Sequence, residues 1–229
     1  MRYTEEASAR MAETFRSVGE KHGYENVNAE FVAFKHFKVQ WQRSYKWISF
    51  RVSDYLADAP GCVLHDLAET LFSKIEGKDV EYSEAMREWV LDESFCREKR
   101  PIFIKRGRYL SRGPVGKHRD LSDSLNRLED AGLIERGSDI QAVWNCDYRS
   151  DLAASYSVLM RTIMVSESLD NADIPDFVLD YVIYRQCLMI KEGIQSFGRS
   201  DTCDISGNEK LFERYQDAER MLNKLCLAL

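Results

Sequence analysis

The chain of 229 residues is poor in several residue types, and each scarcity excludes a class of protein. Only 4 prolines and 12 glycines are present, which leaves no room for a long flexible linker. No stretch approaches the roughly 20 apolar residues that a membrane-spanning helix needs. The residues after Met1 do not form the apolar core of a signal peptide. We therefore expect a folded cytoplasmic protein that does not cross a membrane.

Residues that bind metals or form disulfides are also sparse. The 6 cysteines are scattered without any CxxC pair, which argues against a disulfide scaffold and against a cysteine zinc site. We expect reduced, mostly buried thiols. The 4 histidines all lie at or before His118, so the second half of the chain has none. No glycine-rich phosphate loop and no Ser-His-Asp spacing is present.

What is present is typical of a compact globular protein: 44% hydrophobic and 31% charged residues. Hydrophobic periodicity predicts an α+β fold without internal repeats. Helices are expected at 4–22, 58–75, 82–93, 120–131, 173–191 and 208–227, and strands at 47–53, 140–144 and 155–166. Residues 30–41 fit either a helical turn or the start of a strand.

The domain organisation expected from these elements is one compact unit. It consists of an N-terminal helical segment, residues 1–45, and a main domain, residues 46–229.

A basic strip at 97–119 stands out in an otherwise acidic chain of net charge −6. It has nine Lys/Arg against one acid, Glu98. Such a strip attracts phosphates or an acidic partner, or else it folds back on the acidic surface of the protein itself. The candidate contacts are Lys105, Arg106, Arg108, Arg112 and Lys117.

The segment 175–193 reads PDFVLDYVIYRQCLMIKEG, and Ser166, Leu169 and Asp170 precede it. It resembles the run "SxxLD…P…VLDYVLYHExxHxxxG" of the SprT-like and YgjP-like minimal zinc metallopeptidases, the minigluzincins of the zincin superfamily, particularly those of archaeal type. Looser similarities extend over about 45–225. The resemblance implies a zincin-like fold in which a small mixed sheet packs against an active-site helix, with additional N-terminal helices.

The resemblance fails where those enzymes have their chemistry. In HExxH two histidines on one helix face hold Zn²⁺, and the glutamate is the general base. Those positions fall here on Arg185, Gln186 and Met189, and the third-ligand position falls on Asp201. A guanidinium cannot become a ligand, a thioether is a poor zinc donor and an amide is not a base. We therefore expect no zinc and no other cofactor, and an Arg185–Asp201 ion pair in the place of the metal.

Three functions follow as predictions. The first is an inactive metallopeptidase homologue, a pseudoprotease, that binds an extended protein or peptide along an edge strand near 155–165. The second is a nucleic-acid-associated protein that uses the basic strip, whose Phe103 and Tyr109 could stack on bases. The third is a hydrolase with an unusual site at His65, Asp66 and Glu69, which have the spacing of an altered HExxH motif.

Overall fold

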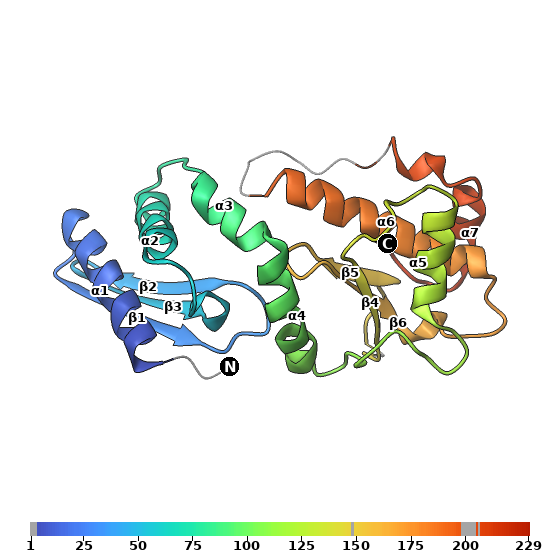
Figure 1. Cartoon of the computed structure of the whole chain (residues 1–229), viewed down its shortest axis with the longest axis horizontal. Coiled ribbons are helices and arrows are strands. Elements are labelled where there is room, and N and C mark those ends of the chain that lie inside the picture. The colour runs from blue at the N-terminus through green and yellow to red at the C-terminus, as the bar shows by residue number, and fades with distance from the viewer. Residues whose placement is uncertain (1–3, 148, 198–204, 206) are drawn as a thin grey trace. The chain divides into compact units, whose positions relative to one another are not determined.

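The structure, a computed structural model, describes residues 4–147, 149–197, 205 and 207–229. Helices and two small three-stranded sheets make it a mixed α/β protein, as the sequence predicted. The chain divides into two compact units (Figure 1). Unit 1 ends at Phe95, and unit 2 contains the described residues from Cys96 onward. No helix in the described ranges has the length and apolar character that crossing a bilayer requires.

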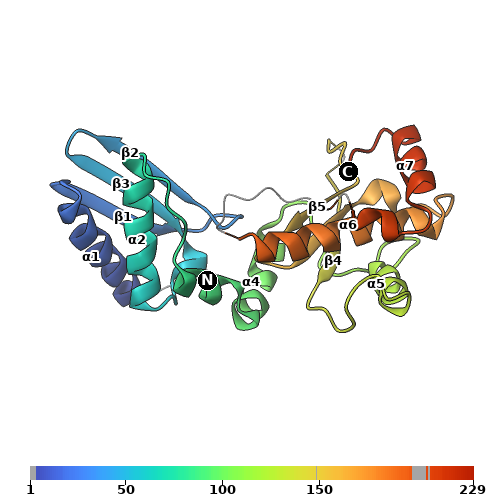
Figure 2. The same cartoon turned by 90° about the horizontal axis from the view of Figure 1, so that it is seen from above.

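Unit 1 consists of one sheet and helices that cover one of its faces (Figure 2). Its elements are α1 (Glu5–Lys21), β1 (Asn26–Val32), β2 (Val39–Ser44), β3 (Trp47–Ser53), the 3₁₀ helix η1 (Asp54–Leu56), α2 (Gly61–Ile75) and α3 (Glu84–Leu91). The strand order is β1-β3-β2, with β1 parallel and β2 antiparallel to β3.

The core of unit 1 forms where α1 and α2 meet the sheet. α1 begins at Thr4, whose side chain accepts a hydrogen bond from the Ala7 amide at 3.2 Å. The ring of Phe50 on β3 makes edge-to-face contacts with Phe15 of α1 at 5.0 Å and Phe72 of α2 at 5.2 Å. Strand alternation therefore directs Phe50 toward the helices and its neighbours Ser49 and Arg51 toward the opposite face.

Unit 2 contains the second sheet and the longest helix. Its elements are α4 (Glu93–Arg106, which begins in unit 1), α5 (Leu121–Asp130), β4 (Gln141–Asn145), β5 (Ala154–Ser157), β6 (Thr162–Ser166), η2 (Glu167–Leu169), α6 (Asp176–Gln195), η3 (Glu209–Leu211) and α7 (Tyr215–Lys224). The strand order is β4-β6-β5, with β4 parallel and β5 antiparallel to β6. α6 packs against β5, β6, α5 and α7.

The two units repeat one topology. Each runs helix, strand, strand, strand, 3₁₀ turn, helix, and each sheet places its third strand in the centre and its second at the antiparallel edge. A short pattern of Ser, Leu, Pro and Val-Leu follows the central strand in both. It is Ser53, Leu56, Pro60, Val63 and Leu64 in unit 1, and Ser166, Leu169, Pro175, Val178 and Leu179 in unit 2. The expectation that the chain has no internal repeat is therefore wrong at the level of structure.

The expected domain boundary also differs from the structure. Residues 26–32 and 39–44, placed in an N-terminal helical segment, are strands that pair with β3. The boundary after residue 45 falls in the turn between β2 and β3, within one sheet. For 30–41 the strand alternative is the better of the two, since β1 ends and β2 begins there.

The predictions for the remaining helices, the strands and the cysteines are confirmed in part. The predicted helices near 4–22, 58–75, 82–93, 120–131 and 173–191 and all the predicted strands are confirmed. The final helix is shorter than expected, because a 3₁₀ turn and an extended Phe212 precede it. The five described cysteines are free thiols, but Cys62, Cys146 and Cys226 are exposed, so the expectation that most would be buried is wrong.

Candidate functional site

The helix α6 carries the positions at which the sequence departs from the metallopeptidase pattern. Pro175 precedes its first residue, and Asp176 places a carboxylate in its first turn, where the helix dipole favours negative charge. Most of the helix is buried, because it lies between the sheet on one side and other helices of unit 2. The position of α6 is therefore fixed by packing, and so is the position from which each of its side chains projects.

The three sequence-predicted positions on α6 lie in different environments. Gln186 is buried, whereas Arg185 and Met189 are half-buried. Arg185 and Met189 are four residues apart and so lie on the same face of the helix, as the spacing predicted. Asp201 lies outside the described residues.

Arg185 forms an ion pair with a residue that sequence reasoning missed. Its Nε lies 3.2 Å from Oε2 of Glu209 in η3, and both atoms are buried. No other described carboxylate pairs with Arg185. Arg185 thus pairs with a carboxylate from the segment after α6, that of Glu209, and the predicted partner Asp201 lies outside the described residues. In the sequence, Glu209 follows no motif that would have identified it.

Aromatic residues fix the segment that supplies Glu209. Tyr184 donates a hydrogen bond from its hydroxyl to the Asn208 carbonyl at 2.7 Å, and Phe212 stacks on the Tyr184 ring at 5.9 Å. Tyr181 donates to Glu219 of α7 at 3.0 Å. Burial, and then the Glu219 carboxylate, raise the pKa of Tyr181, so its hydroxyl remains a donor. η3 and α7 are thus tied to α6 by several contacts.

The residues at these positions do not fit a zinc ion. Zinc is bound by Cys, His, Asp or Glu, and the helix face presents a permanent cation and a thioether. Within the part of the chain that the structure describes, no three such donor residues are grouped as a metal site requires. The carboxylate of Glu209 is a zinc-type donor, but the guanidinium of Arg185 already neutralises it.

The edge strand β5 lies beside α6. Among the described strands β5 lies at the edge of its sheet, because the order is β4-β6-β5. Close approach of the two elements requires a glycine: a Cβ on Gly193 would lie 2.5 Å from the Val158 side chain. Just before β5, Ala153 donates to the Ala228 carbonyl and Ala228 donates to the Asp151 carbonyl, both at 2.7 Å. The chain's own residue 228 thus pairs in parallel with this edge at Leu152.

The basic strip is only partly a free positive surface. Residues 97–106 form most of α4, where Lys99 is buried beside Glu98 and Arg100 pairs with Asp139 at 2.6 Å. Arg119 pairs with Asp176, and Lys117 pairs with Glu167 at 3.1 Å. The alternative that the strip folds onto the protein's own acids is therefore correct for these residues.

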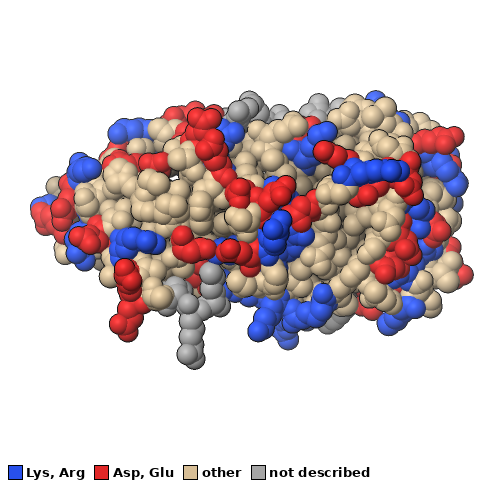
Figure 3. Space-filling model, viewed as in Figure 1, with Lys and Arg blue, Asp and Glu red and all other residues tan. Residues whose placement is uncertain are grey.

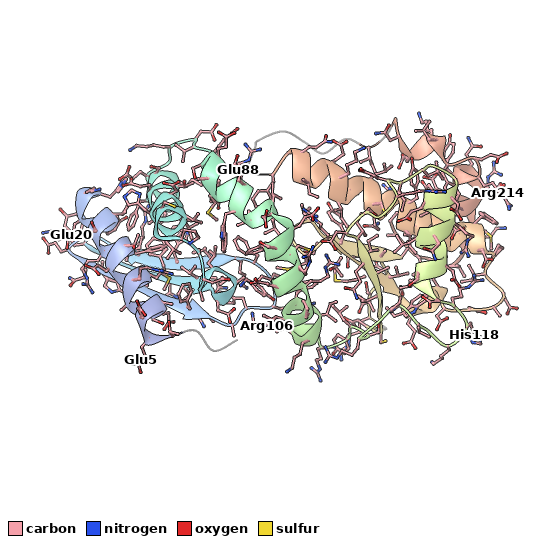
Figure 4. The ribbon with its side chains drawn as sticks, in the orientation of Figure 1. Glu5, Glu20, Glu88, Arg106, His118 and Arg214 are labelled. Atoms are coloured by element: carbon pink, nitrogen blue, oxygen red, sulfur yellow. The ribbon has the colours of Figure 1, made fainter. Side chains whose placement is uncertain are left out.

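Four of the predicted contacts are exposed, Lys105, Arg108, Arg112 and Lys117, and of these Lys117 pairs with Glu167. Figure 3 shows basic side chains gathered around the end of α4, where Figure 4 labels Arg106. Lys105 and Arg112 line a hollow of about 450 Å³ together with Pro101, Ile104 and Gln141. Phe103 is buried and cannot stack on a base, contrary to expectation, and Arg108 lies over the Tyr109 ring at 5.4 Å.

The residues His65, Asp66 and Glu69 do come together on α2, although in a different role. His65 Nε2 lies 3.7 Å from Glu69, but Glu69 also accepts from His22 at 3.2 Å, and Asp66 accepts from Ser83 at 2.7 Å. His22 also contacts Glu76 at 2.6 Å and stacks on Phe72. These carboxylates therefore connect α1 and α3 to α2. His22, at the end of α1, was missed because its partners are about fifty residues away.

No protein-family model, no curated protein and no solved structure matches this chain.

Proposed function

We propose that unit 2 is a metallopeptidase-like module that has lost its metal chemistry and binds an extended peptide along β5. The observation that carries the proposal is the ion pair between Arg185 of α6 and Glu209 of η3, on a helix that packs against the antiparallel edge strand β5. The mixed sheet packed against one long helix agrees with what the family resemblance implies. The guanidinium of α6 and the carboxylate of η3 balance each other, and neither can activate water.

The edge position of β5 in its sheet supports the peptide-binding part of the proposal. An edge strand has unpaired N–H and C=O groups that another extended chain can satisfy. Ala228 forms an isolated parallel bridge with Leu152, two residues before β5 begins, so a short extended segment already pairs near this edge. A peptide that continues along Ala154–Ser157 would extend the same ladder. The bound peptide would end near Val158, whose side chain lies against Gly193 of α6.

The proposal is tested by assays of metal, cleavage and crosslinking on the full chain. Elemental analysis is expected to find far less than one zinc per chain, and casein is expected to remain uncut. A photo-crosslinking amino acid at Ser157 should capture members of a random peptide library, and the same amino acid at exposed Arg136 should not. One bound zinc per chain with chelator-sensitive cleavage would overturn the loss of metal chemistry. Equal capture at the two positions would overturn the peptide site.

The basic strip supports a second proposal, binding of nucleic acid or an acidic partner in unit 2. Its support is limited to the hollow lined by Lys105 and Arg112 and to the exposed Arg108 nearby. A gel shift that weakens with salt in the wild type and disappears in Arg108→Glu/Arg112→Glu is the expected result. Binding that salt leaves unchanged would contradict phosphate contacts.

A further inference from the structure

A second basic segment lies in unit 1, earlier in the sequence than the strip. From Phe31 to Ser53 the sequence has five Lys/Arg and no Asp or Glu, in a chain of net charge −6. This segment contains β2, the turn after it and β3. We call residues 35–51 the hairpin surface. Its concentration of positive charge favours a negatively charged partner.

The aromatic residues of this hairpin are exposed. Trp41 is 45% exposed, Tyr45 at the turn is 90% exposed and Trp47 is 41% exposed. Every residue from Gln40 to Trp47 is exposed, because β2 is the edge strand of its sheet. Large aromatic side chains on a solvated strand are unusual unless a partner covers them.

The strand register arranges these side chains around the free edge. Trp41 lies opposite Phe50 and therefore projects on the face covered by helices, but at its rim. Trp47 lies opposite Ser44 and projects on the other face. On that face Gln40 and Gln42 lie opposite Arg51 and Ser49, and these four line a hollow of about 410 Å³ with Val39 and Trp41. Aromatic, amide and cationic side chains thus lie around the edge strand β2.

Part of the positive charge is not balanced within unit 1. Lys46 pairs with Glu25, and Arg51 lies 3.4 Å from Glu30. Lys35, Lys38 and Arg43 make no ion pair in the described part of the chain, although Lys38 lies over the Phe34 ring and Arg43 over the Trp41 ring. Burial, and then the charges of Lys35 and Lys38, lower the pKa of His36, which agrees with a positive local potential.

We propose that the hairpin surface binds single-stranded nucleic acid, with bases stacked on the exposed aromatic side chains and phosphates beside Lys35, Lys38 and Arg43. Single strands are bound by the combination of a positive surface and aromatic rings, because every base has a face on which a ring can stack. An acidic peptide would use the cations but would leave the aromatic residues without a role. Amides such as Gln40 and Gln42 can donate to and accept from base edges.

The test measures the anisotropy of a fluorescein-labelled 20-nucleotide single-stranded DNA against the full chain. Contact with three phosphates predicts that raising salt from 50 to 200 mM weakens binding about 20-fold. Tyr45→Ala should weaken binding at least about 5-fold through lost stacking. Lys38→Glu/Arg43→Glu should weaken it further. The matched control Arg16→Glu/Lys191→Glu, at exposed positions outside both basic segments, should stay within about 2-fold of the wild type, and circular dichroism verifies that each variant is folded.

Three results would overturn the proposal. The first is absence of binding at low salt. The second is binding that the hairpin variants retain and that Arg108→Glu/Arg112→Glu loses, which would place the site on the basic strip. The third is tight binding of poly-glutamate that Tyr45→Ala does not change, which would identify an acidic-peptide site. The result is independent of the peptide site on β5, because that site lies in unit 2.

Discussion

At the scale of single residues, the loop before α5 shows how one buried carboxylate orders a chain segment. Asp170 accepts hydrogen bonds from the backbone amides of Lys117, His118 and Arg119, the last two at 2.9 and 3.0 Å. Burial alone would raise the pKa of Asp170, but these bonds outweigh it and hold the pKa below its usual value. Gly116 lies against the same carboxylate, where a Cβ would be 2.5 Å from Oδ2.

We predict that Gly116→Ala destabilises unit 2 by about 1–3 kcal/mol, because the added methyl group overlaps Asp170 and the Trp144 indole. Gly113→Ala is the control, since a Cβ there meets no atom within 4 Å. Urea unfolding followed by circular dichroism measures both. Equal stability of the two variants would contradict the close approach described here.

His22 makes the stability of unit 1 depend on pH. Burial lowers its pKa, but hydrogen bonds to Glu76 and Glu69 outweigh burial, so the folded pKa lies above the unfolded value of about 6.5. The protonated ring is favoured in the folded state. Its contribution is therefore fully present below about pH 6.5 and is lost as pH rises through the folded pKa.

We accordingly predict that the free energy of unfolding of unit 1 falls by about 1 kcal/mol as pH rises through this range, and that His22→Gln abolishes the fall. Thermal unfolding in a series of buffers measures the effect. His118→Gln, which changes an exposed histidine of unit 2, should keep the wild-type profile. A profile that is flat in the wild type would count against the two carboxylate contacts.

At the scale of elements, an arginine–carboxylate pair connects α5 to α6. Arg127 donates to both oxygens of Asp180, at 2.9 and 2.7 Å, and Asp180 is only 12% exposed. The two-pronged geometry fixes the direction of one helix on the other. Arg136 and Asp130 form a second arginine–aspartate pair, in which the two side chains are 75% and 77% exposed. Comparing the two pairs measures how much burial adds to the stabilisation by such a pair.

We predict that Asp180→Asn costs about 1.5–3 kcal/mol of stability, because it weakens a hydrogen-bonded charge pair in a half-buried site. Asp130→Asn should cost less than about 1 kcal/mol, since water screens the exposed pair. Chemical denaturation of the two variants gives both values. Similar losses would mean that the α5–α6 contact depends on apolar packing alone.

Periodicity predicted the elements well where an apolar stripe faces a core, as in α1, α2 and α6. It failed at α4, whose charged residues and internal Pro101 conceal a helix. It left β1 and β2 undecided, because the solvated edge strand β2 lacks alternating burial. For the site, the sequence located Arg185, Gln186 and Met189 on α6, but Glu209 reaches Arg185 only through the fold. Partners so distant in sequence leave no local signal.

At the scale of the whole molecule, each unit has its own core and its own ionic contacts. The Phe15–Phe50–Phe72 contacts lie in unit 1, and the cluster around α6 is made only of unit 2 residues. The repeated topology was not visible in the sequence, because the shared pattern is restricted to a few residues after the central strand. In addition, the spacing from the leucine to the proline of the pattern is two residues longer in unit 2 than in unit 1.

We predict that scanning calorimetry resolves two transitions, because units with separate cores unfold separately. His22→Gln should lower only one transition temperature near pH 6, and Asp180→Asn only the other. A single transition that both variants shift equally would show that the units unfold together.

The ion pair on α6 has a consequence for protein engineering. Glu209 already lies beside the position of Arg185, so a carboxylate is in place where a designer would want a third donor. Replacing Arg185 and Met189 with histidine would complete a His₂Glu set on a packed frame, and Gln186→Glu would add a base. All the substitutions in this design lie on one helix.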